Sequence, residues 1–222
     1  MVNPICSLKS YKIYAIPIIY IIGWRGEAGV HDEPQHLFQG EITLKLLDDL
    51  DIKYSVVSKE TKEEEIQNKM KDFNLILKEG KSVAFVIKKG VLKYDGKVDY
   101  KNGYTMIREE VIKYIVNETK DDPLISTRGK VSQELFEIRE SKKEDQGKDI
   151  LTVGSMGHNS SIVLWIAINK PNTKIWCIDG DGAAIMHLGT MGIIGFFNLK
   201  NYVHALINND SHETVGGMPT VA

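Results

Sequence analysis

The sequence predicts an α/β protein with mostly parallel sheets flanked by helices. Short β-branched apolar runs alternate along the chain with longer segments of helical periodicity. Several of these runs end directly in glycine, aspartate or asparagine, as strands do where a loop leads into a helix. With 42% hydrophobic and 26% charged residues among 222, the chain has the ordinary composition of a globular protein with a core.

The first part of the chain carries strand and helix patterns in alternation. The apolar run Ile13–Ile22 superficially resembles a signal peptide, but it contains Pro17, lacks a small-residue cleavage site and is too short to span a bilayer. We interpret this run as a buried strand. Thr61 and Glu64 predict a capping box at a helix start. The predicted elements are strand Ala15–Ile22, helix Glu41–Leu50, strand Tyr54–Val57, helix Thr61–Leu77 and strand Ser82–Ile87.

A segment without apolar periodicity, Lys88–Gly103, carries glycines among lysines and predicts a surface connection. We predict a first domain at 1–122, which includes this connection, and a second at 123–222. The elements predicted after the connection are helix Met106–Val116, strand Pro123–Ser126, helix Val131–Ile138, strand Ile150–Thr152, helix Ser160–Ile168, strand Lys174–Ile178, helix Ala183–Gly195 and strand Tyr202–Ile207.

The charge balance and the cysteines exclude several classes of protein. Interspersed basic (28) and acidic (30) residues give a formal charge of −2, which argues against an electrostatic nucleic-acid binder. Cys6 and Cys177 lie far apart in the sequence, so they form neither a disulfide framework nor a zinc cluster of cysteines, and we interpret both as core thiols. We therefore expect a cytoplasmic protein that binds neither nucleic acid nor membrane.

One predicted strand end has the residues of a metal-diphosphate site. The strand ends in Asp179-Gly180-Asp181-Gly182 and a helix follows at once, so this loop lies at the carboxyl end of a parallel strand, where ligands bind. Glycines let the backbone approach a phosphate, the helix start offers unpaired N–H groups, and Asp181 supplies a hard oxygen for a divalent cation.

The next predicted strand ends in Asn208-Asn209, one helix and one return strand later. If the two strands are neighbours, their carboxyl ends present the Asp181 and Asn209 oxygens together. The alternative is a strand-turn-helix with a polar strand end, which recurs in many α/β proteins.

This Gly-Asp-Gly followed by Asn-Asn resembles the signature of thiamine-diphosphate enzymes, and Gly154–His158 is similar to the loop that holds the cofactor's pyrimidine in that family. The resemblance implies that magnesium binds Asp181, Asn209 and the carbonyl of Ser211. It also implies that the Gly154 carbonyl accepts a hydrogen bond from the cofactor and that Met156 wedges it, although Met156 as core packing stays open. The implied cofactor-binding residues are Gly154, Ser155, Met156, Gly180, Asp181, Gly182, Ala183 and Asn209.

Other blocks resemble the phosphonopyruvate decarboxylases in particular. They are Gly23–Glu27, Asp32–His36, Gly129-Lys130, Glu134–Glu137, Thr152–His158 and Asn208–Thr220. This resemblance implies parts of two thiamine-diphosphate-binding domains: residues 1–122 as the C-terminal part of a pyrimidine-binding domain and 123–222 as the N-terminal part of a diphosphate-binding domain.

The implied reaction is nonoxidative decarboxylation of 3-phosphonopyruvate to phosphonoacetaldehyde and carbon dioxide, in phosphonate biosynthesis, with thiamine diphosphate and Mg²⁺. The resemblance places Gln35 and His36 near the substrate as catalytic proton relays. Arg25 is a candidate bidentate partner for the phosphonate. The alternatives are an ordinary solvated loop for residues 32–36 and a structural role for Arg25.

The resemblance also implies that the glutamate that activates the cofactor lies before the first matched residues and that the second domain continues past Ala222. We therefore expect a chain truncated at both ends that does not decarboxylate at a normal rate alone. A working form is expected to be a homo-oligomer or to need a complementing subunit. Three alternatives stay open: a decarboxylase of sulfopyruvate or another 2-oxoacid, an inactive fragment or assembly subunit, and a generic nucleotide-binding protein.

Overall fold

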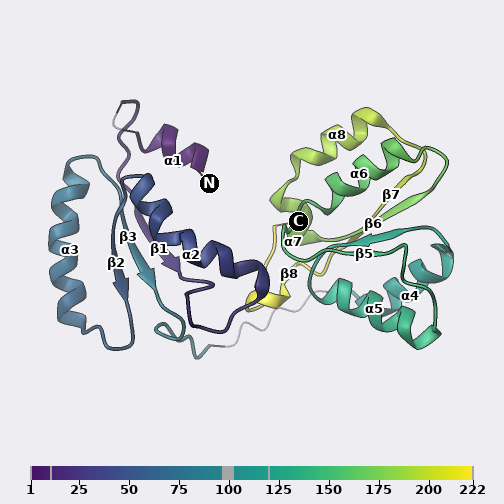
Figure 1. Cartoon of the computed structure of the whole chain (residues 1–222), viewed down its shortest axis with the longest axis horizontal. Coiled ribbons are helices and arrows are strands. Elements are labelled where there is room, and N and C mark those ends of the chain that lie inside the picture. Colours follow the sequence, from purple (N-terminus) through teal and green to yellow (C-terminus); the bar gives the residue numbers. More distant parts are fainter. Residues whose placement is uncertain (1, 11, 97–102, 120, 222) are drawn as a thin grey trace. The chain divides into compact units, whose positions relative to one another are not determined.

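The computed structural model describes residues 2–10, 12–96, 103–119 and 121–221, and it divides into two compact units, Met1–Asp95 and Gly96–Ala222 (Figure 1). Each unit has a parallel sheet with helices on its faces, which confirms the predicted fold class. The division falls inside the predicted connection Lys88–Gly103, of which residues 97–102 lie outside the described residues.

The first unit has a three-stranded parallel sheet in the order β1-β3-β2. Its elements are α1 (Val2–Leu8), β1 (Ile19–Gly23), α2 (Pro34–Asp49), β2 (Lys53–Val57), α3 (Glu63–Lys78) and β3 (Val83–Ile87). The central strand β3 is apolar throughout because both of its faces are covered (Figure 1). Ala84 and Val86 pack with Leu47 of α2, whereas Val83 and Phe85 pack with Phe73 of α3.

Three sequence predictions for the first unit are corrected by the structure. β1 begins at Ile19 instead of Ala15, and as an edge strand it leaves Ile21 72% exposed, so it is not the buried strand predicted. α2 begins at Pro34, well before the predicted start, because proline is preorganised for the first helical turn. The Thr61 capping box is wrong, because the Thr61 hydroxyl accepts the Ser58 N–H at 3.0 Å and α3 begins two residues later.

The second unit has a four-stranded parallel sheet in the order β5-β4-β6-β7. Its helices are α4 (Arg108–Thr119), α5 (Lys130–Lys142), α6 (Asn159–Asn169), α7 (Asp181–Met186) and α8 (Gly189–Phe197), with a 3₁₀ turn, η1 (Glu213–Val215). Its strands are β4 (Leu124–Ser126), β5 (Ile150–Leu151), β6 (Ile175–Gly180) and β7 (Tyr202–Ile207), followed by the short antiparallel pair β8 (Ser211–His212) and β9 (Met218–Pro219).

Alternate residues of the central strands face two different helix layers, seen above and below the sheet in Figure 1. Leu124 and Ile178 pack on α4 and α5, while Ile125, Ile175 and Cys177 pack on α6. α4 packs on α5 within this unit, although the predicted domain boundary at residue 122 assigned that segment to the first domain. This packing on both faces holds β6 in place, and the carboxyl end of β6 carries the Gly-Asp-Gly loop.

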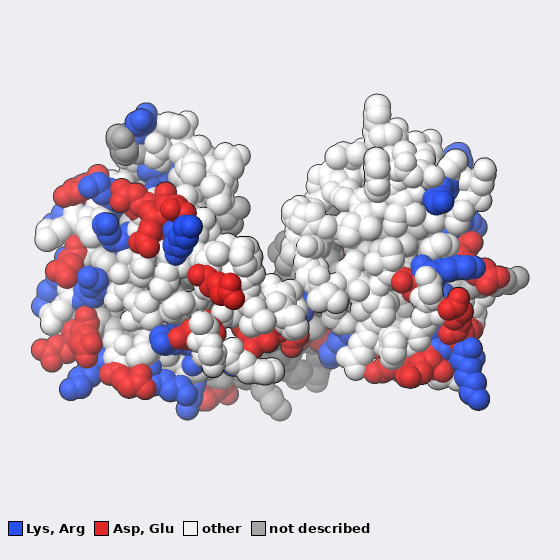
Figure 2. Space-filling model, viewed as in Figure 1, with Lys and Arg blue, Asp and Glu red and all other residues white. Residues whose placement is uncertain are grey.

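The predicted single helix Ala183–Gly195 is wrong, because the chain forms two helices that separate near His187 and Leu188. The apolar pattern continues through the break, and for that reason periodicity alone does not reveal it. α8 contains no charged residue and no fully buried residue, and Phe196 is 85% exposed. The region of α6 and α8 is correspondingly without charge in Figure 2.

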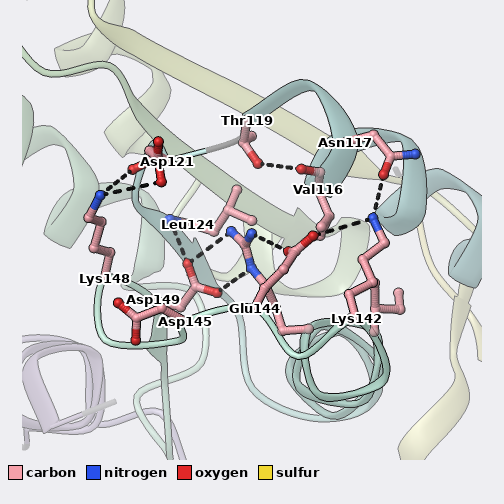
Figure 3. Close-up of polar contacts among 12 residues, drawn as sticks. Val116, Asn117, Thr119, Asp121, Leu124, Lys142, Glu144, Asp145, Lys148 and Asp149 are labelled. Atoms are coloured by element: carbon pink, nitrogen blue, oxygen red, sulfur yellow. Dashed lines mark hydrogen bonds and ion pairs between the residues drawn. The ribbon is translucent and has the colours of Figure 1, made fainter.

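A buried ion-pair network holds the loop between α5 and β5 (Figure 3). The Arg139 guanidinium donates from Nε to Asp149 Oδ2 at 2.9 Å and from Nη1 to Glu144 Oε2 at 2.8 Å. Asp149 Oδ1 also accepts the N–H of Leu124 at 3.2 Å, which joins the loop to the first residue of β4. Burial alone lowers the pKa of Arg139, but its hydrogen bonds to the two carboxylates outweigh this effect and raise it.

In the view of Figure 2 acidic and basic side chains are interspersed, as the sequence indicates. None of the helices in the described part of the chain combines the length and the apolar character that a bilayer crossing needs.

Candidate functional site

The carboxyl ends of neighbouring strands β4, β6 and β7 meet around a cavity of about 160 Å³ in the second unit. The β6 end contributes Gly180 and α7 starts at Asp181, whose carboxylate is buried. The pairing of Gly180 with Ile207 brings Asp181 beside the Asn208-Asn209 end of β7. This is the arrangement that the two strand-end motifs predict.

Seven of the predicted cofactor or metal residues line this cavity: Met156, Gly180, Asp181, Gly182, Ala183, Asn209 and Ser211. Gly154 and Ser155 do not line it; they precede Met156 in a turn where both have positive φ, +74° and +45°. Their roles stay predictions.

The oxygens that would bind a cation have neighbours from the C-terminal loop. Asp181 Oδ2 accepts a hydrogen bond from the Thr220 hydroxyl at 2.6 Å. Asn209 Oδ1 accepts the N–H of Ser211 at 3.1 Å, which fixes the turn after β7. Asp181 and Asn209 both line the cavity, and carboxylate and amide oxygens are hard ligands of the kind that magnesium takes, so the donor set fits this cation.

Two glycines permit close packing at the site. A Cβ on Gly182 would lie 2.7 Å from His212 Nδ1, so the His212 ring rests on the glycine backbone. Gly157 has φ +88°, and a Cβ there would lie 2.9 Å from the Ala183 carbonyl and 2.7 Å from His187 Cδ2. The turn after β5 therefore packs directly on α7, and Gly157 joins the two loops that the sequence singles out.

A cationic wall of the cavity was missed by the sequence reasoning. Arg108 from α4 donates to both oxygens of Glu134 at 2.9 and 2.6 Å and to Glu213 Oε2 at 2.6 Å. Lys130, at the start of α5, donates to the other Glu213 oxygen. Hydrogen bonds from Lys130 and then Arg108 lower the pKa of Glu213. Glu213 thus bridges two cationic side chains, and any anion that enters the cavity competes with the Glu213 carboxylate for them.

Thr127, immediately after β4, also lines the cavity. Its hydroxyl is buried and has no hydrogen-bond partner among the described residues. A buried polar group without a partner is costly, and a ligand oxygen in the cavity would satisfy it. Because β4 lies beside β6, Thr127 lies at the same edge of the sheet as Gly180. The single sequence signal for a role of Thr127 in the site was its position directly after a predicted strand.

The remaining predicted residues lie in the first unit. Arg25 makes a bidentate pair with Asp32, Nε to Oδ2 at 2.8 Å and Nη2 to Oδ1 at 2.6 Å. The Asp32 carboxylate also accepts the Gly26 N–H, and the hydrogen bond from Arg25 is the largest cause that lowers its pKa. Arg25 and Asp32 line a second cavity of about 410 Å³.

Gln35 and His36 lie in the first turn of α2, where the His36 N–H donates to the Glu33 carbonyl at 2.9 Å. A Cβ on Gly26 would lie 2.0 Å from the His36 carbonyl oxygen, so this glycine lets the Arg25 loop pack beneath the helix start. The structure thus places Arg25 and His36 on adjoining segments of one unit. Their catalytic and substrate roles stay predictions.

Comparison with known proteins shows what the chain is similar to. Residues 130–222 match the model of the thiamine pyrophosphate enzyme C-terminal TPP binding domain. Over its whole length the chain is 28% identical to phosphonopyruvate decarboxylase of Streptomyces viridochromogenes and 25% identical to that of Streptomyces hygroscopicus. The chain is thus similar to thiamine-diphosphate-dependent decarboxylases. It spans 58% and 57% of the length of these two relatives.

A further protein to which the chain is similar is the sulfopyruvate decarboxylase subunit beta of Methanocaldococcus jannaschii. It is 36% identical over 51% of the chain, and the match covers 57% of the subunit. The family match includes Asp181, Asn209 and the cavity segments from Lys130 onward, whereas Arg108 and Thr127 lie before it.

Proposed function

We propose that this chain contributes the diphosphate- and magnesium-binding part of a thiamine-diphosphate-dependent decarboxylase of a 3-substituted pyruvate, with 3-phosphonopyruvate as the first candidate substrate. The observation that carries the proposal is the meeting of Asp181 and Asn209 at one cavity on neighbouring parallel strands. The similarity to phosphonopyruvate decarboxylases, which extends over the whole of this chain, supports the substrate class.

In this proposal Asp181, Asn209 and the Ser211 carbonyl hold Mg²⁺, and the glycines of the loop let the backbone approach the diphosphate. Thiamine diphosphate, when bound, supplies the electron sink that decarboxylation of a 2-oxoacid requires. Met156 in the cavity wall is proposed to support the cofactor, together with Gly154 and Ser155 before it.

Residues of the first unit are proposed to serve the substrate. Gln35 and His36 would move a proton, and Arg25 would bind the substrate's second anionic group. Because both oxygens of Asp32 already engage Arg25, the substrate anion must share or displace this carboxylate. That exchange makes Arg25 a weaker candidate than the metal ligands.

A second candidate substrate is sulfopyruvate, which the 36% identity to a sulfopyruvate decarboxylase β subunit favours. The β-subunit relatives also support a working form that contains a second chain, either another copy or a complementing subunit.

Both cysteines are free, which supports a reducing compartment such as the cytoplasm. Cys177 is buried but Cys6 is exposed, so the prediction that both are core thiols is wrong for Cys6.

The proposal is tested first by binding, since cofactor affinity does not require turnover. Thiamine diphosphate is titrated calorimetrically into the full chain with and without Mg²⁺, for the wild type, Asp181→Ala and Asn209→Ala. Asp210→Asn is the matched control, because it removes a neighbouring acid and asparagine tolerates the φ of +55° at that position. We expect magnesium-dependent binding in the wild type and the control and its loss in both Ala variants.

Carbon dioxide release from phosphonopyruvate and from sulfopyruvate is then compared, for the chain alone and with a complementing decarboxylase chain. Faster release from phosphonopyruvate supports the first candidate, and faster release from sulfopyruvate the second. Equal thiamine-diphosphate affinity in the wild type and both Ala variants would contradict the assignment of the metal site.

A further inference from the structure

A second group of possible metal ligands lies on β6 and β7, just before the strand ends that form the cavity. Cys177 and Asp179 point to the same face of β6, two residues apart, and the register pairs Cys177 with His204 of β7. The Cys177 sulfur lies 3.4 Å and His204 Nε2 lies 3.0 Å from the same Asp179 oxygen, Oδ2. The three ligand atoms all lie within 4.8 Å of one another.

These separations are close to those of tetrahedral zinc. With Zn–S of about 2.3 Å and Zn–O and Zn–N of about 2.0 Å, tetrahedral geometry places sulfur and oxygen about 3.5 Å apart and nitrogen and oxygen about 3.3 Å apart. The observed 3.4 and 3.0 Å differ from these values by a few tenths of an ångström. Two of the three separations therefore already fit such an ion, and the third, from the Cys177 sulfur to the His204 nitrogen, is within 4.8 Å.

The Asp179 carboxylate supplies the second argument. Its side chain is 1% exposed, and Oδ1 has no hydrogen-bond partner among the described residues. The partners of Oδ2 are a thiol, which is a weak donor, and an imidazole. A buried carboxylate with so few donors is costly, and a divalent cation would offset that cost.

Donors also converge on the sulfur. Asn159 Nδ2 lies 3.2 Å from Cys177 Sγ, and hydrogen bonding by Tyr202 and Asn159 acts to lower the pKa of the Cys177 thiol. Such bonds stabilise a thiolate ligand. Burial first, and then the charge of Asp179, raise the pKa of Cys177, so without a cation the sulfur carries its proton.

We propose that Cys177, Asp179 and His204 form a binding site for a zinc-like transition-metal ion, separate from the magnesium ligands and independent of the proposed function. The ion takes the thiolate sulfur, Asp179 Oδ2 and neutral His204 Nε2, and the thiol proton leaves to solvent. Water or Asp179 Oδ1 fills the fourth position. His204, with 17% of its side chain exposed, lies on the entry side.

The site would clamp the strands that carry the cavity loops. Asp179 precedes Asp181 by two residues, and His204 precedes Asn209 by five. An ion bound by both strands adds a cross-link to the β6–β7 ladder just below the loops. The expected role is structural, and thermal stability reports it without any measurement of activity.

The test uses the full chain, without thiamine diphosphate, after removal of metals by a chelator. Co²⁺ replaces Zn²⁺ as the probe, because a cobalt–thiolate bond gives a charge-transfer absorption that oxygen and nitrogen ligands do not. The Cys6→Ser chain is the key sample: the sequence has two cysteines, so this absorption then reports Cys177 directly. It needs no Cys177 variant to fold.

We expect one Co²⁺ per chain with thiolate absorption in the wild type and Cys6→Ser, displacement by Zn²⁺, and a higher melting temperature with Zn²⁺. Cys177→Ser and His204→Gln should each lose at least about 100-fold in affinity, since even removal of an outer hydrogen-bond partner costs 10–100-fold. Asp181→Ala should retain the absorption, which separates this site from the magnesium ligands. Absence of thiolate absorption in Cys6→Ser, or cobalt affinity unchanged in folded Cys177→Ser, would overturn the proposal.

Discussion

The buried Arg139 network gives a stability prediction that the structure makes quantitative. In Asp149→Ala, Arg139 loses its Nε partner at 2.9 Å and keeps Glu144 at 2.8 Å. Both Arg139 and Asp149 are nearly inaccessible, with 5% and 4% of their side chains exposed. Removing one partner of a buried pair costs about 3–5 kcal/mol, because the other charge stays buried.

The remaining Glu144 contact places the expected cost near the lower limit, about 3 kcal/mol. The Leu124 N–H also loses its acceptor, which adds about 1 kcal/mol. We therefore expect the second unit of Asp149→Ala to be destabilised by about 3–4 kcal/mol. With a urea slope of about 1–3 kcal/mol per molar, the midpoint falls by at least about 1 M.

Urea unfolding is followed by fluorescence in a Trp24→Phe, Trp165→Phe background, which leaves Trp176 of the second unit as the reporter among three tryptophans. Trp176 suits this purpose because its indole N–H donates to Asp122 at 3.2 Å, next to the network.

Glu109→Gln is the matched control, since it removes an exposed helical ion pair with Lys113 at 2.5 Å, half of each side chain being exposed. Exposed pairs of this kind contribute about 0.5 kcal/mol or less. If the midpoints of Asp149→Ala and Glu109→Gln agree within error, burial does not govern the strength of this network and the reasoning is refuted.

Three further predictions concern the cavity and the turn at Gly157 that packs on α7. Lys130 and Arg108 lower the pKa of Glu213 from 4.5, so the stability from this contact is complete above about pH 4.5 and is lost as pH falls through the lowered pKa. Urea midpoints between about pH 7 and pH 3 should therefore fall less in Glu213→Gln than in the wild type, and parallel profiles would contradict this. The same variant should bind inorganic diphosphate without Mg²⁺ on the order of tenfold more tightly by calorimetry, because the competing carboxylate is gone; unchanged affinity would show that Glu213 does not compete. Gly157→Ala should cost about 2 kcal/mol or more through its positive φ and the overlap with Ala183, measured by urea unfolding, whereas Gly189→Ala, with nothing within 4 Å, should stay within about 1 kcal/mol of the wild type.

Local pattern predicted most strands and helices of both units. β7 has the predicted bounds Tyr202–Ile207, because β-branched and aromatic residues lie between an asparagine on one side and two on the other. The break between α7 and α8 was not predictable, because apolar residues continue through it. The exposed face of β1 was missed, since an apolar run does not show whether its strand is central or at an edge.

The candidate site was predictable where the residue type directly after a predicted strand indicates a metal ligand, as at Asp181 and Asn209. The cationic wall was not, because Arg108 and Glu213 are 105 residues apart and meet only through tertiary packing. Thr127 lines the cavity because β4 lies next to β6 in the sheet, and no local sequence pattern predicts the order of strands.

The register of β6 on β7 sets the spacing of the proposed magnesium ligands. Gly180 pairs with Ile207, so Asp181 and Asn209 sit at a fixed offset along the ladder. A slip of one residue would move one oxygen by about 3.3 Å relative to the other and turn its strand's side chains to the opposite face. Insertions in these strands should therefore abolish cation binding even where the sheet survives, whereas length changes in the distant α6–β6 turn should be tolerated. The hydrogen-bond ladder between β6 and β7 therefore fixes the distance between the two proposed metal ligands.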